Sequence, residues 1–388
     1  MIELLAPAGD QECVRAAIAN GANAIYFGLD CGFNARYRAK NFGVDDLGPL
    51  ADLLHKHNMR GYVTMNTLVF PSEMPKIVDA IIAIAESGID AVLVQDFGVA
   101  RLVREICPDL EIHASTQMSL TSSETISVAS SLGLARVVLA RELSLREIRK
   151  IAAATTMPLE VFIHGALCVA YSGQCLTSES LGGRSANRGQ CAQACRLPYE
   201  LVVDGADRPT GDTQYLLSPQ DLAGYESIPA LIDAGIASIK IEGRLKTPEY
   251  VANIVSTYRK AIDDTLAGRE MRVGNEEQRR MELSFSRGFS PGWLEGNNHK
   301  RLVPGLSSAK RGLLLGQIEA IGGDRIVLKI KHPLALGDGI AVALGQNDDW
   351  IGGRVYSLRV DDREVNRVSS GQSVSIAGRH GDFQKQSL

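Results

Sequence analysis

The sequence contains no apolar run close to the ~20 residues that a membrane-spanning helix requires, so an integral membrane protein is not expected. A recognisable export signal is also missing, because Met1-Ile2-Glu3 leads directly into a segment typical of a folded domain. Such a chain is expected in the cytoplasm, a reducing compartment in which thiols persist. A basic surplus is lacking too: the net charge is −4, which does not indicate nucleic-acid binding unless a basic patch is local.

The sequence lacks the usual metallopeptidase motif, because it contains no H-E-x-x-H pattern. Hydrolysis needs an activated nucleophile with a base, or a metal with an open coordination position. Cys168 with His164 could form a thiol–imidazole pair, but such a pair leaves three neighbouring cysteines unexplained. Proteolysis is therefore kept only as an alternative.

Cysteines are concentrated in one stretch. Four of the seven lie between residues 168 and 195 with the spacing C-x6-C-x15-C-x3-C, namely Cys168, Cys175, Cys191 and Cys195. A disulfide pair is not expected in a reducing compartment. Four thiolates suit structural zinc, although the paired C-x2-C knuckles of zinc ribbons are absent. An iron–sulfur cluster tolerates irregular ligand spacing better, but spacing alone leaves zinc and iron–sulfur undecided.

The first 264 residues alternate short apolar segments with amphipathic ones, which predicts βαβ units and a parallel sheet. Helices are expected over 44–57, 74–87 and 145–153, and from Ser218-Pro219 and Thr247-Pro248 onward. Eight strands in this length predict a (β/α)8 barrel, with a doubly wound sheet as the alternative. The strands are expected at 3–8, 24–28, 61–66, 91–96, 111–117, 136–142, 159–164 and 238–242.

Most of these strands end in a polar residue. The ends are Asn66, Asp96, Gln117, Glu142, His164 and Glu242. Since the carboxyl ends of barrel strands meet at one rim, a shared pocket is expected there, covered by the cysteine-rich segment after the seventh strand. His164, Glu142 and Glu242 are the candidate catalytic residues. Candidate substrate-binding residues are Arg36, His113, Gln117, Arg141, Lys240 and Arg244, of which the cations suit an anionic ligand.

The end of the chain has a different pattern. Residues 268–300 form a polar connector, and 311–377 shows period-two apolar segments separated by turns, which predicts a small antiparallel β-barrel. The expected domains are a catalytic barrel at 1–267 that includes the cysteine-rich loop 166–199, the connector, and a β-barrel at 301–388. A hairpin is expected at Asp204-Gly205.

The run Glu160-x-Phe162-x-x-Gly165-Ala166-Leu167-Cys168, followed by Gly173-x-Cys175, resembles the signature of the U32 family, the collagenase-like peptidases. The segment GRSANRGQCAQACRLPY (183–199) is most similar to the branch that hydroxylates a cytidine of 23S ribosomal RNA. A sister branch forms 5-hydroxyuridine at the tRNA wobble position, and another hydroxylates ubiquinone precursors. The resemblance extends from about residue 3 to residue 264.

This resemblance implies a specific chemistry. In the family the matching cysteines hold a [4Fe-4S] cluster, and the RNA branches depend on prephenate as co-substrate. The resemblance therefore implies that the predicted cations bind a small dicarboxylate. The expectation is an RNA hydroxylase that forms a 5-hydroxypyrimidine in rRNA or tRNA, with a possible redox partner. A U32-type peptidase and a zinc-braced binding protein remain the alternatives.

Overall fold

The computed structural model describes residues 2–35, 39–243, 245–310, 312–322, 325–343 and 350–377. The chain forms two compact units, one of Met1–Tyr199 with Tyr215–Pro304 and one of Glu200–Gln214 with Gly305–Leu388. We call them the barrel unit and the C-terminal unit. Segment 268–300, predicted as a connector, belongs to the barrel unit, and segment 200–214 belongs to the C-terminal unit.

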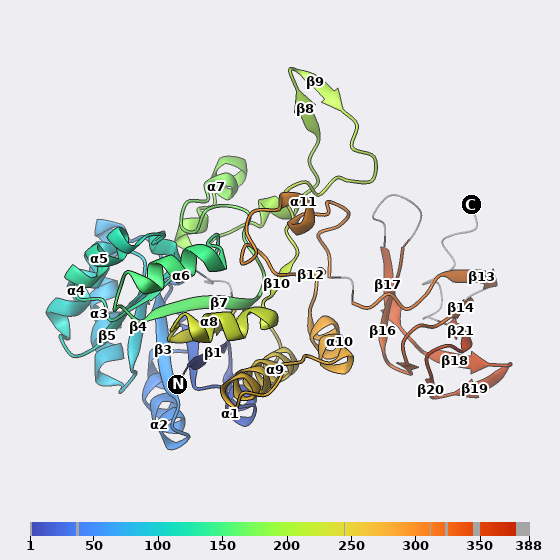
Figure 1. Ribbon diagram of the computed structural model, residues 1–388, viewed down its shortest axis with the longest axis horizontal. Coiled ribbons are helices and arrows are strands. Elements are labelled where there is room, and N and C mark those ends of the chain that lie inside the picture. Colours follow the sequence, from blue (N-terminus) through green and yellow to red (C-terminus); the bar gives the residue numbers. More distant parts are fainter. Residues whose placement is uncertain are drawn as a thin grey trace. The chain divides into compact units, whose positions relative to one another are not determined.

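The barrel unit is built on eight parallel strands that close into a cylinder (Figure 1). Closure is made by the last strand, which pairs with both β1 and β7. The strands are β1 (Glu3–Pro7), β2 (Ala24–Gly28), β3 (Arg60–Met65), β4 (Ala91–Val94), β5 (Glu111–Ala114), β6 (Arg136–Val138), β7 (Leu159–Gly165) and β11 (Ser238–Ile241). The predicted (β/α)8 barrel is confirmed.

Helices surround this cylinder because each has one apolar face. In α3, Ile77, Ala80, Ile81 and Ile84 are buried at the spacing of a single helix face. The surrounding helices are α1 (Gln11–Ala19), α2 (Leu47–Lys56), α3 (Met74–Glu86), α4 (Phe97–Ile106), α5 (Ser123–Ser131), α6 (Leu145–Ala153), α8 (Ile228–Asp233) and α9 (Pro248–Leu266). The predicted start of α9 is confirmed, since the side chain of Thr247 caps it by accepting from the amide of Tyr250.

Further short elements complete this unit. They are α7 (Thr177–Gly182), α10 (Asn275–Ser284), α11 (His299–Leu302), and the 3₁₀ turns η1 (Val44–Asp46), η2 (Pro71–Glu73), η3 (Thr116–Met118), η4 (Ala186–Arg188), η5 (Ala194–Arg196) and η6 (Tyr225–Ser227). No helix among the described residues is long and apolar enough to cross a bilayer.

The barrel interior is filled with side chains near the amino ends of the strands. Glu160 receives hydrogen bonds from Lys240 Nζ at 3.0 Å and from an Arg136 guanidinium nitrogen at 3.2 Å, and Arg136 also pairs with Glu3. Because two carboxylates face two cations, the buried charges balance. This network fills the barrel interior towards the amino ends of the strands. We call the other end, where the carboxyl ends of the strands meet, the mouth.

The helix predicted from Ser218-Pro219 is wrong at its start. Residues Asp221–Ala223 form strand β10, which runs antiparallel to β7 and beside the two-residue strand β12 (Phe289–Ser290). The helix α8 begins only at Ile228. Leu222 pairs with Gly165 of β7 and is buried inside the barrel unit. This pairing outweighs the helix start that Ser218-Pro219 indicates.

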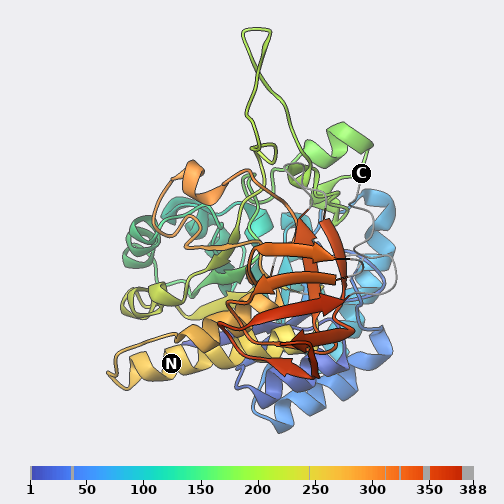
Figure 2. The ribbon, with the colours of Figure 1, turned by 90° about the vertical axis from the view of Figure 1, so that its right-hand side faces the viewer.

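The C-terminal unit consists of antiparallel strands (Figure 2). A five-stranded sheet has the order β13 (Ile318–Gly322), β14 (Arg325–Lys329), β21 (Ser373–Ala377), β18 (Ser357–Val360) and β19 (Arg363–Val365). Three strand pairs accompany it: β15 (Leu334–Ala335) with β20 (Arg367–Val368), β16 (Gly339–Ala343) with β17 (Trp350–Arg354), and β8 (Leu201–Val203) with β9 (Ala206–Arg208). The antiparallel character and the Asp204-Gly205 hairpin are therefore confirmed.

Candidate functional site

The segment between β7 and β8, residues 166–199, lies across the mouth of the barrel, and we call it the cysteine loop. Gly173, at φ +76°, approaches the backbone so closely that a Cβ there would lie 2.1 Å from the carbonyl oxygen of Gln117. A Cβ on Gly189 would lie 2.3 Å from the carbonyl oxygen of Asn34. Since Gln117 follows β5 and Asn34 follows β2, the loop reaches both sides of the mouth.

Two carboxylates at the strand ends hold the first half of the cysteine loop. Glu142, after β6, accepts hydrogen bonds from the Ser172 amide at 3.2 Å and from its hydroxyl at 2.8 Å. Glu242, after β11, accepts one from the amide of Ala166 at 3.4 Å. The structure thus brings both candidate catalytic carboxylates to the loop, where each accepts at least one hydrogen bond from a backbone amide.

A third contact fixes the second half of the loop. Arg188 forms an ion pair with Glu73, donates to the carbonyl of Leu68 at 2.7 Å, and lies 4.3 Å from the centre of the Phe70 ring. Hydrogen bonding from Arg188 lowers the pKa of Glu73 to about 2. Residues 68–73 follow β3, so the loop is held at several strand ends.

The other polar strand ends contact the surrounding backbone or a neighbouring side chain. Asn66 accepts a hydrogen bond from the Ala35 amide and donates one to Ser115, both at 3.0 Å. Asp96 caps α4, accepting from the amides of the first helical turn. Gln117 lies in η3, where its carbonyl is the group that Gly173 approaches. These residues organise the rim on which the cysteine loop rests.

His164 points into the layer between the barrel and helix α9. It is 1% exposed, its Nδ1 lies 3.1 Å from the Tyr258 hydroxyl, and the rings of Tyr250 and Phe289 lie beside it. The register of β7 and β11 shifts at this point. Lys240 pairs with Phe162, but the next residue, Ile241, pairs with His164, so β7 has one extra residue there. Burial lowers the pKa of His164 to about 3, so the ring is neutral at neutral pH. This environment does not favour direct contact with a substrate.

Two further candidates lie inside the barrel. His113 is fully buried, its Nε2 lies 3.2 Å from Glu111, and burial lowers its pKa. Lys240 is 2% exposed, bonds Glu160, and lies 4.3 Å from the centre of the Tyr26 ring. Both belong to the packed interior below the mouth, so a role in substrate binding stays a prediction for them.

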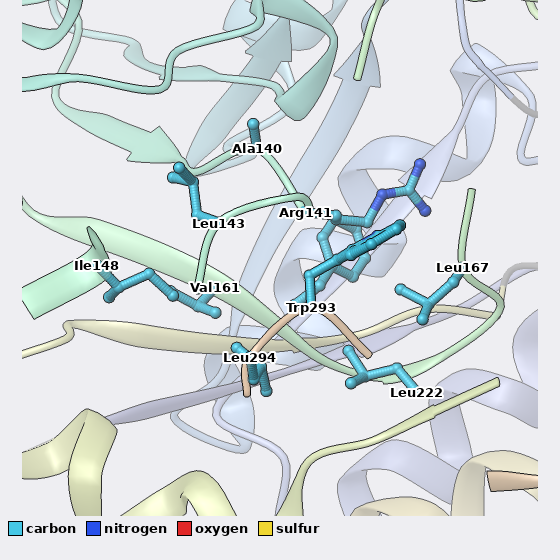
Figure 3. Close-up of a pocket in the computed structure, with 10 residues that line it drawn as sticks. Ala140, Arg141, Leu143, Ile148, Val161, Leu167, Leu222, Trp293 and Leu294 are labelled. Carbon is cyan, nitrogen blue, oxygen red and sulfur yellow. The ribbon is translucent and has the colours of Figure 1, made fainter. Parts of the chain in front are cut away.

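Arg141 lines a narrow pocket at the root of the cysteine loop (Figure 3). Its guanidinium donates to the carbonyl of Ala166 at 3.3 Å and lies 5.4 Å from the centre of the Phe162 ring. Trp293 lines the same pocket, which leaves room for little more than a water molecule. Within the described parts of the chain Arg141 forms no ion pair. The other two predicted anion-binding residues, Arg36 and Arg244, lie outside the described residues.

The four loop cysteines are free thiols gathered in one region. Burial raises the pKa of Cys195, the adjacent Arg196 lowers it, and the neighbouring Cys168, Cys191 and Cys175 raise it, so all four cysteines lie within electrostatic range. The amide of Gln193 donates to the Cys191 sulfur at 3.4 Å. Across the described residues, no three histidine, cysteine, aspartate or glutamate side chains converge where one metal ion could bind.

This donor set fits an iron–sulfur cluster chemically. A single zinc ion binds sulfur at about 2.3 Å and requires closely converging thiolates, whereas a cluster of four irons has more widely separated ligands. The half-buried Arg196, next to Cys195, adds a cation that an anionic cluster can neutralise. Cys168, Cys175, Cys191 and Cys195 are the residues that would hold the cluster.

The expectation that the sequence contains no G-x-S-x-G pattern is wrong. Gly288–Gly292 reads GFSPG, which has the G-x-S-x-G spacing of a serine-hydrolase elbow. Ser290 nevertheless belongs to β12, is buried, and accepts a hydrogen bond from the amide of Gly292 at 3.2 Å. Among the described residues no histidine bonds it, and the strand-to-helix turn of such an elbow does not follow it. The pattern does not form a nucleophile site.

The fold and the loop define a (β/α)8 barrel whose mouth is covered by a four-cysteine segment. Residues 9–304 match the description "Peptidase family U32", and the chain belongs to this family. Membership in a family with this name does not itself specify the reaction.

The curated relatives are named for two different activities, RNA hydroxylation and proteolysis. The chain is 40% identical to a 23S rRNA 5-hydroxycytidine synthase of Escherichia coli over 88% of this chain and 52% of that protein. It is 33% identical to an uncharacterized protease of Methanocaldococcus jannaschii over 98% and 96% of the two chains. It is 39% identical to tRNA hydroxylation protein P1 of Bacillus subtilis over 71% and 66%. The chain thus spans about half the length of the ribosomal RNA relative.

Proposed function

We propose that this protein is an RNA hydroxylase that forms a 5-hydroxypyrimidine. The first candidate product is 5-hydroxycytidine in 23S rRNA, and the second is 5-hydroxyuridine at the tRNA wobble position. The proposal rests on the cysteine loop, which lies across the barrel mouth, together with the similarity to relatives named for these two reactions. A base inside an RNA stack cannot enter a barrel mouth, so the substrate base must be unstacked or extruded.

The proposed cofactor is a [4Fe-4S] cluster on Cys168, Cys175, Cys191 and Cys195. When bound, it would supply redox or Lewis-acid chemistry at the mouth. Four free thiols on one loop support this assignment, as does the cation beside Cys195. Zinc is the alternative, and iron and sulfide assays on protein purified without air separate the two.

The proposed co-substrate is a dicarboxylate such as prephenate. Arg141 supports it, because it lines the narrow pocket at the root of the loop and forms no ion pair in the described part of the chain. The pocket itself has room for little more than a water molecule, so a dicarboxylate would contact the guanidinium outside it. A guanidinium that is free of a carboxylate can bind one from a ligand through charge-assisted hydrogen bonds. Glu142 and Glu242 orient the loop above this pocket. Substrate contacts by Arg36 and Arg244, a catalytic role for His164 and a redox partner stay predictions.

The deciding experiment compares RNA from a strain that lacks the gene with RNA from its parent. Digested total RNA is analysed by mass spectrometry for 5-hydroxycytidine and 5-hydroxyuridine. One of them should disappear, return with the wild-type gene, and stay absent with Cys168→Ser. Cys107→Ser is the matched control, because Cys107 ends α4 outside the cysteine loop. Unchanged levels of both nucleosides in the deletion strain refute the proposal.

Peptidase activity is the alternative that the family name and the archaeal relative suggest. The arrangement of the candidate nucleophiles does not favour it, because His164 lies beside Tyr258 and Ser290 accepts from Gly292. Purified protein is expected to leave gelatin and casein intact. Cleavage that is lost in Cys168→Ser but retained in Cys175→Ser would support a thiol peptidase instead.

A further inference from the structure

Arg196 connects the end of the cysteine loop to its beginning. It directly follows Cys195 in η5, and its guanidinium donates to the carbonyl of Leu167 at 3.1 Å, one residue before Cys168. The same group donates to the hydroxyl of Ser218 at 2.8 Å and to the carbonyl of Pro219. One side chain therefore links the backbone beside two of the four cysteines.

The charge of Arg196 has no carboxylate partner in the described residues, because all three acceptors are neutral. The neighbouring acidic group Asp221 is 1% exposed and is already paired with Arg287, which donates to it through its side chain and its amide, each at 3.0 Å. Arg196, Asp221 and Arg287 together carry one excess positive charge. Burial and the neighbouring Arg287 lower the pKa of Arg196, while Cys195, Asp221 and Cys168 raise it.

A half-buried cation without a counter-charge is destabilising, so the fold implies an anion beside it. Four neutral thiols do not provide that anion. Four thiolates around a [4Fe-4S]²⁺ core carry a net charge of −2, and one-electron reduction makes it −3, by simple addition of charges. A fixed positive charge nearby stabilises the more negative state.

We propose that Arg196 is a positioning residue for the iron–sulfur centre, acting as its counter-cation and raising its reduction potential. The inference depends on the proposed cofactor and adds a residue that tunes it. The hydrogen bond to Leu167 has a second effect, because it fixes the backbone that carries Cys168.

Three variants test this proposal. Arg196→Gln removes the charge and Arg196→Lys keeps it. Arg188→Gln is the matched control, because it removes an arginine from the same loop whose charge Glu73 already neutralises. Each protein is prepared without air, its iron and sulfide are assayed, and the cluster is titrated with dithionite while electron paramagnetic resonance follows the reduced form.

Arg196→Gln is expected to lower the equilibrium constant for reduction about tenfold, equal to about 59 mV for one electron. Arg196→Lys and Arg188→Gln should stay within about twofold of wild type. An unchanged potential in Arg196→Gln, or an equal shift in Arg188→Gln, overturns the role of Arg196. If Arg196→Gln retains no iron, the iron content of Arg196→Lys decides. Iron in Arg196→Lys supports a requirement for the positive charge. If both Arg196 variants lack iron while Arg188→Gln contains it, the proposed role of the Arg196 charge is overturned. Wild-type protein without iron instead refutes the proposed cofactor itself.

Discussion

Gly173→Ala should release the cysteine loop from the barrel mouth. Gly173 has φ +76°, and an added Cβ would lie 2.1 Å from the carbonyl oxygen of Gln117 and 3.0 Å from the hydroxyl of Ser119. The first contact involves backbone, so a side-chain rotation cannot relieve it. The loop must move away, which pulls the adjacent Ser172 from Glu142.

The magnitude follows from these contacts. A left-handed backbone costs a residue with a Cβ about 1 kcal/mol or more. Losing at least one hydrogen bond between Ser172 and the Glu142 carboxylate costs roughly a further 2 kcal/mol. The docked loop should therefore be destabilised by about 3 kcal/mol, equivalent to a roughly hundredfold larger open population.

Two glycines in the same loop provide controls. Gly183 has φ +66° with open space around its Cβ position, so Gly183→Ala tests the backbone cost alone. Gly182 has neither a positive φ nor a close neighbour, so Gly182→Ala should have almost no effect.

Hydrogen exchange of a peptide that contains Ser172, followed by mass spectrometry, measures loop opening. Exchange should be about a hundredfold faster in Gly173→Ala and at most about fivefold faster in Gly183→Ala, in keeping with their free-energy costs. Equal exchange in these two variants refutes the close packing of the loop on the mouth.

Three other perturbations test the interior, the buried histidine and the pocket. Glu160→Gln removes the buried carboxylate that pairs with Lys240 and should lower the free energy of unfolding in urea by about 3–5 kcal/mol. Adding Lys240→Met should recover part of that loss, and no loss in the single variant contradicts the ion pair. His164 has a pKa of about 3 in the folded protein, whereas in the unfolded chain it takes up a proton below pH ~6.5. The free energy of unfolding should therefore fall by about 1.4 kcal/mol per pH unit as the pH is lowered towards 3. His164→Gln should flatten that curve, and an unchanged slope argues against a neutral buried ring. Arg141→Gln should raise the KM for the carboxylate co-substrate about tenfold with a smaller change in kcat, whereas an unchanged KM removes Arg141 from the anion site.

The strands of the barrel could be predicted from the sequence because their signal is local. Apolar runs such as Ala24–Gly28 are buried on both faces, and Leu145–Ala153 has a serine cap followed by an apolar face. Strand β10 could not be predicted in this way. Its three residues follow a serine–proline pair that favours a helix start, and only pairing with the end of β7 makes them a strand.

Side-chain direction at the candidate site depends on contacts between distant parts of the chain. Alternation along β7 places Glu160 and Phe162 inside the barrel and predicts the same for His164. The register shift beside Lys240 turns His164 towards Tyr258, and no sequence pattern signals it. The partners of Glu142 were equally hidden, because Ser172 is thirty residues away in sequence.

These contacts separate two groups of charged residues at the mouth. The carboxylates Glu142 and Glu242 bond the cysteine loop, and Arg188 is neutralised by Glu73. Arg141 and Arg196 differ, because in the described part of the chain each donates only to neutral oxygens. One lines the pocket below the loop and the other adjoins its thiols. The two cations donate to neighbouring carbonyls, Arg141 to Ala166 and Arg196 to Leu167, and each leaves a positive charge for a different anion, one diffusible and one held by the cysteines. The two variants should therefore separate cleanly: Arg141→Gln should change co-substrate affinity without moving the reduction potential, and Arg196→Gln should do the reverse.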